Sequence, residues 1–179
     1  MIEQIHDTEQ VILVDRDDRD IGVAGKLDAH VQGRLHRAVS VVVLDQHDRL
    51  LLQRRALSKY HSAGLWTNTC CGHPRPGETT ETAAKRRLME EMGLTCELRE
   101  LGAIMYRAVL PEQLIEHEID HVFLGNCEHN PNPAAAEVCE WRWQARSELR
   151  EDLLCRAHLY TAWLPLLLRK IDAVLTSKV

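Results

Sequence analysis

The chain has 179 residues, of which 45% are hydrophobic and 27% are charged, and its formal net charge is −5. This length and composition predict a single domain over residues 1–179 with a sizeable core. The acidic balance argues against a nucleic-acid partner, which needs a basic surface, whereas a small anionic substrate needs only a local basic pocket.

The sequence also argues against a membrane or secreted protein. No apolar run approaches the roughly 20 residues that a membrane helix requires. Residues 1–10 are polar and acidic, unlike a secretory signal. The six cysteines show no zinc-binding spacing, so we expect mostly small buried or surface thiols in a reducing compartment, the cytoplasm.

Strands dominate the elements predicted for the first part of the chain. Val11–Asp15 is expected to be the first strand, with a turn at Asp17–Asp20. Ala38–Leu44 and Leu50–Arg54 are expected to form a hairpin, because each run is rich in aliphatic residues and polar residues separate them. Residues 55–78 show no such pattern and are expected to form a long insert of loops.

The clearest helix follows this insert. Thr79 or Thr80 is a suitable N-cap, and the residues Ala83–Glu91 propagate a helix well. Gly93 is a typical residue at a helix C-terminus, because glycine readily adopts the left-handed conformation found there. The sequence therefore predicts a helix between the two threonines and this glycine.

Further strands are expected in the second part of the chain. One lies within Glu97–Val109, another at Glu116–Leu124, and a third at Glu140–Gln144. Alternation along the third strand places Trp141 and Trp143 on one face. The order of elements so far predicts a mixed α/β (α+β) class.

Two helices are expected near the end of the chain. Ser147–Arg156 has a helical pattern, and a last helix is expected to begin at Pro165, because proline fits the first helical turn. This start leaves Trp163 just outside the helix and free to face a pocket, although a core residue at the base of the helix is the alternative. Residues 131–136 are expected to be a surface loop and not a domain boundary.

The strongest motif spans residues 72–94, with the sequence GHPRPGETTETAAKRRLMEEMGL. Five residues separate Gly72 from Glu78, and seven separate Glu78 from Arg86. The segment resembles the Nudix box, a loop–helix–loop that holds divalent cations against a diphosphate. The resemblance implies a Nudix-like α/β/α sandwich with a mixed sheet.

One face of the helix in this box departs from the pattern of Nudix hydrolases. Arg87, Glu90 and Glu91 are spaced i, i+3 and i+4 and share a helix face, where carboxylates would bind a hard cation such as Mg²⁺. The hydrolases have a glutamate at the position of Arg87. A guanidinium there weakens a hydrolytic multi-metal site and favours direct binding of a diphosphate.

Three more segments point to one particular group of Nudix proteins. They are RRALSK at Arg54–Lys59, WTN at Trp66–Asn68 and CGHP at Cys71–Pro74. With the altered box, they resemble the type 1 isopentenyl-diphosphate isomerases over about residues 11–163. The resemblance implies an isomerase that interconverts isopentenyl diphosphate and dimethylallyl diphosphate by protonation and deprotonation at carbon, for isoprenoid biosynthesis.

The resemblance implies a metal site that holds Mn²⁺ or Zn²⁺. Its expected ligands are His30, His36, His73, Glu116 and Glu118. Residues i and i+2 of a strand project to the same side, so both glutamates can reach one cation. The spacing from His30 to His36 is one residue shorter than in the family. Glu91 is expected to hold a Mg²⁺ ion that bridges to the diphosphate.

The other histidines are expected to lie outside this site. His117 should point away from the metal, because it stands between two residues that face it. Five more are expected to be surface residues: His6, His47, His61, His129 and His158.

The same resemblance assigns the proton-transfer groups. Cys71, and not Cys70, matches the catalytic cysteine. Cys71 and Glu118 are expected to flank the five-carbon chain. Glu118, or Tyr106 assisted by it, is expected to deliver the first proton, and Cys71 as a thiolate to remove the second. Trp163 resembles the tryptophan whose indole face stabilises a carbocation.

The diphosphate is expected to bind Arg55, Lys59 and Arg87. Two alternative functions stay open. One is a Nudix pyrophosphohydrolase, against which Arg87 and the histidine and glutamate residues outside the box argue. The other is an inactive Nudix-like binding module, which would be expected to lack Cys71 or Glu118.

Overall fold

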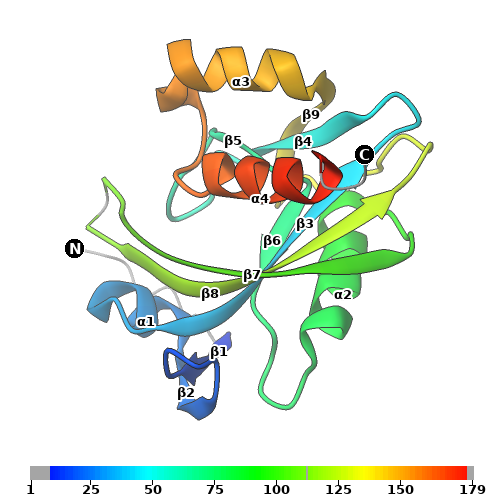
Figure 1. Cartoon of the computed structure of the whole chain (residues 1–179). Coiled ribbons are helices and arrows are strands. Elements are labelled where there is room, and N and C mark those ends of the chain that lie inside the picture. Colours follow the sequence, from blue (N-terminus) through cyan, green and yellow to red (C-terminus); the bar gives the residue numbers. More distant parts are fainter. Residues whose placement is uncertain (1–8, 112, 177–179) are drawn as a thin grey trace.

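The first strands form one edge of a mixed sheet in the computed structural model (Figure 1). Strand β1 (Gln10–Val14) pairs antiparallel with β2 (Asp20–Gly25) and also with the start of β3 (His36–Leu44). Helix α1 (Lys26–Gln32) connects β2 to β3. The structure describes residues 9–111 and 113–176.

Strand β3 organises the sheet, because several strands pair with it. It runs parallel to β8 (Ile115–Asn126), and β8 pairs antiparallel with β7 (Leu98–Val109). The short strand β6 (Cys70–Gly72) also pairs with β3. The sheet thus brings the strand that carries His36 beside the strand that carries Glu118.

A second group of strands continues the sheet from the end of β3. Leu44 pairs with Leu50 of β4 (Arg49–Arg55). Strand β4 then pairs antiparallel with β5 (Trp66–Thr67) and with β9 (Val138–Ala145). Trp141 and Trp143 of β9 are both partly buried against one hydrophobic cluster, as expected for two residues on the same face of a strand.

Helices cover both faces of the sheet (Figure 1). Helix α2 (Thr80–Met92) packs on the core that contains Val41, whereas α3 (Arg146–Cys155) and α4 (Leu164–Thr176) pack on the core that contains Val42. Successive residues of β3 thus point to opposite helical layers. The expected α/β/α sandwich with a mixed sheet is confirmed.

Both predicted ends of helix α2 are confirmed. The Thr79 hydroxyl accepts a hydrogen bond from the Thr82 backbone N–H at 3.2 Å, as an N-cap should. Gly93 ends the helix with φ of 62°. A Cβ atom at Gly93 would lie 2.6 Å from the Asn132 carbonyl oxygen, so the adjoining loop leaves room only for glycine.

The structure contains elements that the sequence did not predict. Helix α1 has seven residues and no side-chain N-cap, and β2 includes two glycines. Such short segments carry weak local signals, and tertiary contacts decide their conformation. The expected insert of loops at residues 55–78 in fact contains β5 and β6. A short 3₁₀ helix, η1 (Ala157–Leu159), separates α3 from α4.

Within the described ranges, no helix is both long enough and apolar enough to cross a bilayer. The segment at residues 131–136 is a loop whose Asn132 N–H donates to the Met92 carbonyl oxygen at 2.9 Å. This contact ties the loop to the end of α2.

Candidate active site

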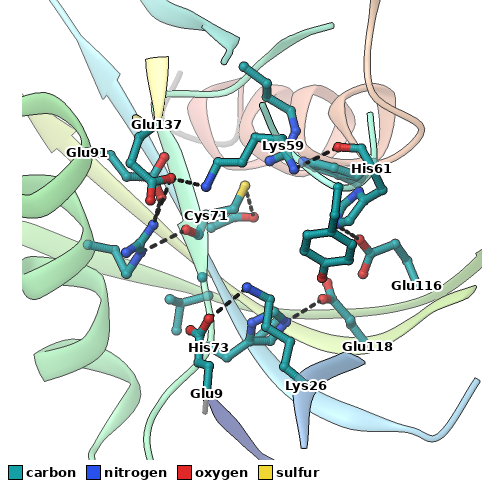
Figure 2. Close-up of a pocket in the computed structure, with 18 of the residues that line it drawn as sticks. Glu9, Lys26, Lys59, His61, Cys71, His73, Glu91, Glu116, Glu118 and Glu137 are labelled. Carbon is teal, nitrogen blue, oxygen red and sulfur yellow. Dashed lines mark hydrogen bonds and ion pairs between the residues drawn. The ribbon is translucent and has the colours of Figure 1, made fainter. Parts of the chain in front are cut away.

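A cavity opens beside β3, β6 and the N-terminus of α4 (Figure 2). It is bounded by side chains from segments that are distant in the sequence. Most of the residues expected in the site line it: Arg55, Lys59, Cys71, His73, Arg87, Glu91, Tyr106, Glu116, Glu118 and Trp163. The remaining two, His30 and His36, are fully buried and lie next to His73.

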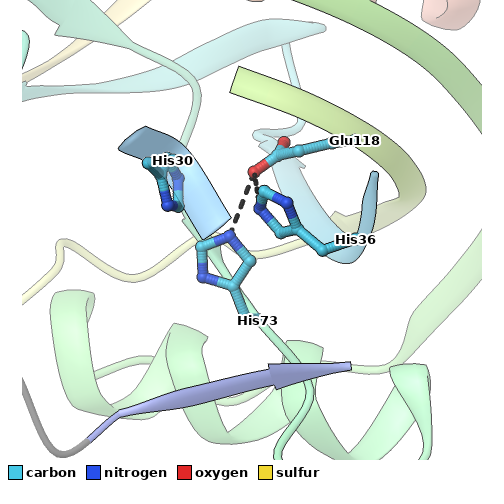
Figure 3. Close-up of side chains that lie close together, drawn as sticks. All are labelled: His30, His36, His73 and Glu118. Carbon is cyan, nitrogen blue, oxygen red and sulfur yellow. Dashed lines mark hydrogen bonds and ion pairs between the residues drawn. The ribbon is translucent and has the colours of Figure 1, made fainter. Parts of the chain in front are cut away.

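Four of the expected metal ligands converge at one end of this cavity (Figure 3). Ligand atoms of His30, His36, His73 and Glu118 all lie within 4.8 Å of one another. The parallel register pairs His36 with Glu118, and His73 Nε2 lies 3.0 Å from Glu118 Oε1. Glu116, the fifth expected ligand, is buried and lies 3.0 Å from His30 Nε2 through Oε2.

Backbone carbonyls set the tautomers of two of these histidines. His30 Nδ1 donates to the Lys26 carbonyl oxygen at 2.6 Å, and His36 Nδ1 donates to the Arg34 carbonyl oxygen at 2.8 Å. A carbonyl oxygen only accepts, so in the neutral rings each Nε2 carries a lone pair.

The lone pair of a neutral His30 then faces Glu116 Oε2, which is also an acceptor when the carboxyl is ionised, and the buried Nε2 of His36 has no hydrogen-bond partner among the residues that the structure describes. A divalent cation would satisfy both arrangements. The donor set of three imidazoles and two carboxylates suits a borderline or hard divalent ion. The residues present therefore fit a metal centre.

His61 also belongs to this cluster, so its expected place on the surface is wrong. It is 5% exposed, and its Nε2 lies 3.4 Å from Glu116 Oε1. The contacts that bury it come from distant segments, and no spacing in the sequence marked it. The expectation of exposure is confirmed for His47, His129 and His158. His6 lies outside the described residues.

His117 is turned away from the cluster, as expected. Its Nδ1 donates to the Gly33 carbonyl oxygen at 2.9 Å.

The two cysteines of β6 point to opposite sides of the sheet. Cys70 is fully buried in the core under α2, whereas Cys71 lines the cavity. Alternation along a strand produces this difference. The Cys71 thiol donates to Asn68 Oδ1 at 3.1 Å, and Trp163 Nε1 donates to the same oxygen at 3.2 Å. Asn68 thus links the thiol to the indole.

Glu118 and Tyr106 form a second proton-carrying group in the cavity. They face each other across the antiparallel pair of β7 and β8, and the Tyr106 hydroxyl donates to Glu118 Oε2 at 2.6 Å. Burial raises the pKa of Tyr106 well above its usual value, and Glu118 adds to this shift. Burial alone would raise the pKa of Glu118, but the adjacent His36 and His73 hold it well below its usual value.

The surroundings of Cys71 favour the protonated thiol. Burial raises the pKa of its thiol to about 12, and the nearby Asp120 and Glu91 carboxylates add to the shift. These surroundings disfavour the thiolate that is expected when Cys71 removes a proton, because burial leaves the sulfur little water to stabilise a negative charge.

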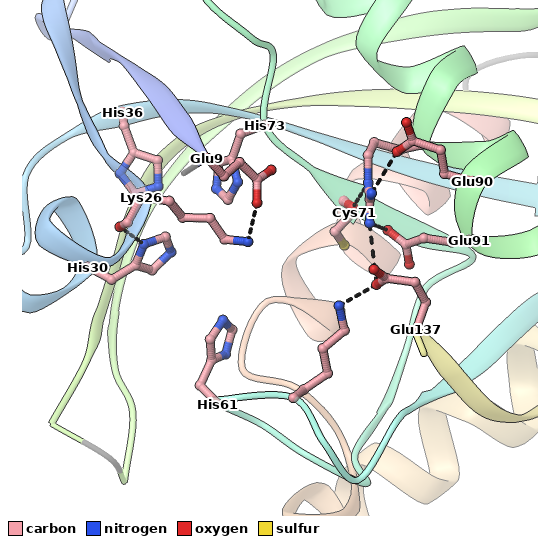
Figure 4. A network of polar contacts seen from close by, with 12 residues as sticks. Glu9, Lys26, His30, His36, His61, Cys71, His73, Glu90, Glu91 and Glu137 are labelled. Carbon is pink, nitrogen blue, oxygen red and sulfur yellow. Dashed lines mark hydrogen bonds and ion pairs between the residues drawn. The ribbon is translucent and has the colours of Figure 1, made fainter. Parts of the chain in front are cut away.

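A second group of charged side chains, around Glu91 and Glu137, lies apart from the histidines (Figure 4). Arg87 Nη2 donates to Glu91 Oε1 at 2.6 Å and lies 3.4 Å from Glu137 Oε2. Lys59 forms an ion pair with the same Glu137 oxygen. A Cβ atom on Gly72 would lie 2.7 Å from Arg87 Cγ, so this glycine lets the arginine cross β6 closely.

The sequence did not predict two further charged groups of the cavity, one at each end (Figure 4). Glu137 lies between Lys59 and Arg87, at the end of the loop before β9. Lys26 lines the cavity and pairs with Glu9 at 2.7 Å. Neither belongs to the motifs in the sequence, and only the approach of the loop and of α1 brings them to the cavity.

Arg55 also lines the cavity, close to Trp163. Its guanidinium lies 5.8 Å from the centre of the Trp163 ring, and its Nη2 donates to the His61 carbonyl oxygen at 3.1 Å. Trp163 itself is 3% exposed.

Comparison with known proteins places this geometry in a family. The Nudix domain family matches residues 34–164. The isopentenyl-diphosphate Delta-isomerase 1 of Aromatoleum aromaticum is 53% identical, over 92% of this chain and 93% of the relative. The chain belongs to the isopentenyl-diphosphate Delta-isomerases of the Nudix family. Another such isomerase, from Serratia proteamaculans, is 47% identical over 92% of each chain.

Solved structures agree on the fold of this isomerase family member. A protein from Deinococcus radiodurans matches with a TM-score of 0.77 and 20% identity, over 90% of this chain and 98% of the other. A MutT protein from Methanosarcina mazei matches with a TM-score of 0.64 and 19% identity, over 78% of this chain and 94% of the other. At such low identity, the likeness concerns the Nudix fold alone.

Proposed function

We propose that this chain interconverts isopentenyl diphosphate and dimethylallyl diphosphate, as the names of its relatives indicate for those proteins. One observation carries the proposal beyond family membership. The Cys71 thiol and the hydrogen-bonded pair of Glu118 and Tyr106 line one cavity whose far end holds the cations Arg87 and Lys59. Such a cavity can bind an anionic diphosphate while proton-transfer groups face its carbon chain.

The reaction needs an acid and a base at different carbons. An unactivated alkene gains one proton and loses another, through an intermediate with tertiary carbocation character. We assign these transfers to Cys71 on one side of the carbon chain and to Glu118 with Tyr106 on the other. Because the reaction is reversible, each group serves as acid in one direction and as base in the other.

The buried indole of Trp163 protects the intermediate. Its ring excludes water, and a cation over its face gains roughly 0.5–2 kcal/mol. Arg55, Lys59 and Arg87 hold the diphosphate, Arg55 and Arg87 through two-pronged hydrogen bonds and Lys59 as a point charge.

Two cation sites belong to this proposal. His30, His36, His73, Glu116 and Glu118 would hold Mn²⁺ or Zn²⁺, and Glu91 would hold Mg²⁺ together with the diphosphate. The metals, when bound, supply positive charge that neutralises the carboxylates and the diphosphate and makes the adjacent Tyr106 hydroxyl more acidic.

We also propose the domain organisation, the binding partner and the cellular compartment of the enzyme. Residues 1–179 form one isomerase domain, with the box at residues 72–94 as its diphosphate side. Its partner is a small diphosphate and not a nucleic acid, in keeping with the net charge of −5. All six cysteines are free thiols, which supports a reducing compartment, the cytoplasm.

Turnover in deuterated water tests the function directly. With isopentenyl diphosphate and Mg²⁺, we expect dimethylallyl diphosphate that carries deuterium on carbon, with the diphosphate intact, as seen by NMR. An isomerase must exchange hydrogen between carbon and solvent, whereas a hydrolase attacks phosphorus and leaves the carbon skeleton unlabelled. Release of phosphate or diphosphate without carbon-bound deuterium would instead identify a Nudix pyrophosphohydrolase, and binding without turnover would identify an inactive module.

A variant of His73 tests the metal centre. The wild type is expected to retain one transition-metal ion per chain on purification, and His73→Ala is expected to lose it, because a neutral imidazole among the ligands is removed. Elemental analysis by mass spectrometry measures the content. His129→Ala, which alters an exposed histidine, is the matched control. If His73→Ala retains both its metal and its rate, the proposed ligand set is wrong.

A further inference from the structure

His61 lies on the loop between β4 and β5, and the structure holds its ring inside the protein. The ring is 5% exposed, although the loop itself is at the surface of the cavity. The next residue, Ser62, has φ of 50°, a left-handed conformation that is uncommon for residues other than glycine. Ser62 Oγ lies 3.3 Å from His61 Nδ1. The turn thus directs His61 inward and leaves its Nε2 facing the metal cluster.

Glu116 lies between two imidazoles as a result. Its Oε2 is 3.0 Å from His30 Nε2, and its Oε1 is 3.4 Å from His61 Nε2. The two rings are stacked, with centres 5.9 Å apart. Ligand atoms of His30, His61 and Glu116 all lie within 4.8 Å of one another, as do those of a second group that consists of His30, His36, His73 and Glu118. His30 therefore belongs to both groups.

We infer that His61 is a further metal ligand of this centre, contributing its Nε2 on the side of Glu116. The inference rests on the metal centre proposed above and deepens it. The main group of three histidines and Glu118 extends through His30 and Glu116 to His61, so the cation is approached from the substrate cavity as well as from the sheet. An additional imidazole favours Zn²⁺ or Co²⁺ over Mg²⁺, which prefers oxygen ligands.

The position of His61 also connects the metal centre to the diphosphate-binding loop. Arg55 donates to the carbonyl oxygen of His61 at 3.1 Å, and Lys59 lies two residues before it. A cation that holds the His61 ring thereby holds the segment that carries both cationic side chains. Metal binding is then expected to reduce proteolytic cleavage and hydrogen exchange of residues 57–65 in the wild type, and to do so less in a variant without this ring.

Titration of the purified apoprotein with Co²⁺ tests the inference, because cobalt absorption reports the ligands of the ion. His61→Ala is expected to bind Co²⁺ at least about 10-fold more weakly than the wild type, since removal of a residue that only supports a ligand already costs about this much, and to give a different absorption spectrum at saturation. Added imidazole is expected to restore both the affinity and the spectrum, by filling the space of the missing ring. His117→Ala, which removes a neighbouring ring that is turned away, should match the wild type.

Other outcomes would overturn the inference. Unchanged affinity and spectrum in His61→Ala would exclude His61 as a ligand while leaving the proposed metal centre intact. Weaker binding with an unchanged spectrum and no restoration by imidazole would show that the ring only supports the fold, and His61→Gln, which keeps a polar side chain of similar length, would then bind like the wild type. Failure of the wild type itself to bind Co²⁺ would refute the metal centre as a whole.

Discussion

Replacement of Cys71 by alanine is expected to lower kcat by at least about 10³-fold, because it removes one of the two groups that transfer protons at carbon. The KM should change little, since the hydrogen-bond partners of the thiol among the described residues are the uncharged Asn68 and Ser40. Initial rates of isomer formation by NMR, together with direct binding of the diphosphate, separate these two quantities.

Cys70 provides a control one residue away. Its side chain is fully buried in the core below α2, so Cys70→Ala is expected to cost about 1 kcal/mol in the free energy of unfolding and to leave the rate of the folded protein nearly unchanged. Equal losses of kcat in Cys70→Ala and Cys71→Ala would mean that the assignment of the catalytic thiol is unfounded.

Glu118→Gln is expected to lower kcat at least as much as Cys71→Ala does, since the Glu118 carboxylate serves both the proton transfer and the metal centre. Its Oε2 accepts from the Tyr106 hydroxyl and its Oε1 lies 3.0 Å from His73 Nε2. We expect a fall in kcat of more than about 10³-fold and a fall in metal content, measured by stopped assays and elemental analysis on the same sample.

Two comparisons separate the roles of Glu118. Tyr106→Phe removes the hydroxyl that Glu118 accepts but leaves every expected ligand, so it should lower the rate and retain the metal. Glu100→Gln changes a more exposed carboxylate on the neighbouring strand, paired with His121, and should leave both unchanged. Wild-type activity in Glu118→Gln would remove Glu118 from the mechanism.

The sequence alone predicted those features of the site that depend only on neighbouring residues. The helix of the box was predicted from Thr79 and Gly93, because capping and left-handed termination depend on neighbouring residues only. Alternation along a strand likewise placed His117 away from the metal cluster. The family resemblance supplied the residue types expected in the cavity, and the structure brings those residues together.

The tertiary structure decided the features that depend on contacts between distant segments. Such contacts join His30 to Glu116 across 86 residues and His73 to Glu118 across 45 residues. His61 was expected on the surface, yet the left-handed turn at Ser62 directs it toward Glu116. The raised pKa of the Cys71 thiol has the same kind of origin, because distant segments bury it. A local pattern identifies which residues are present, whereas burial and strand register determine which of them meet and in which protonation state.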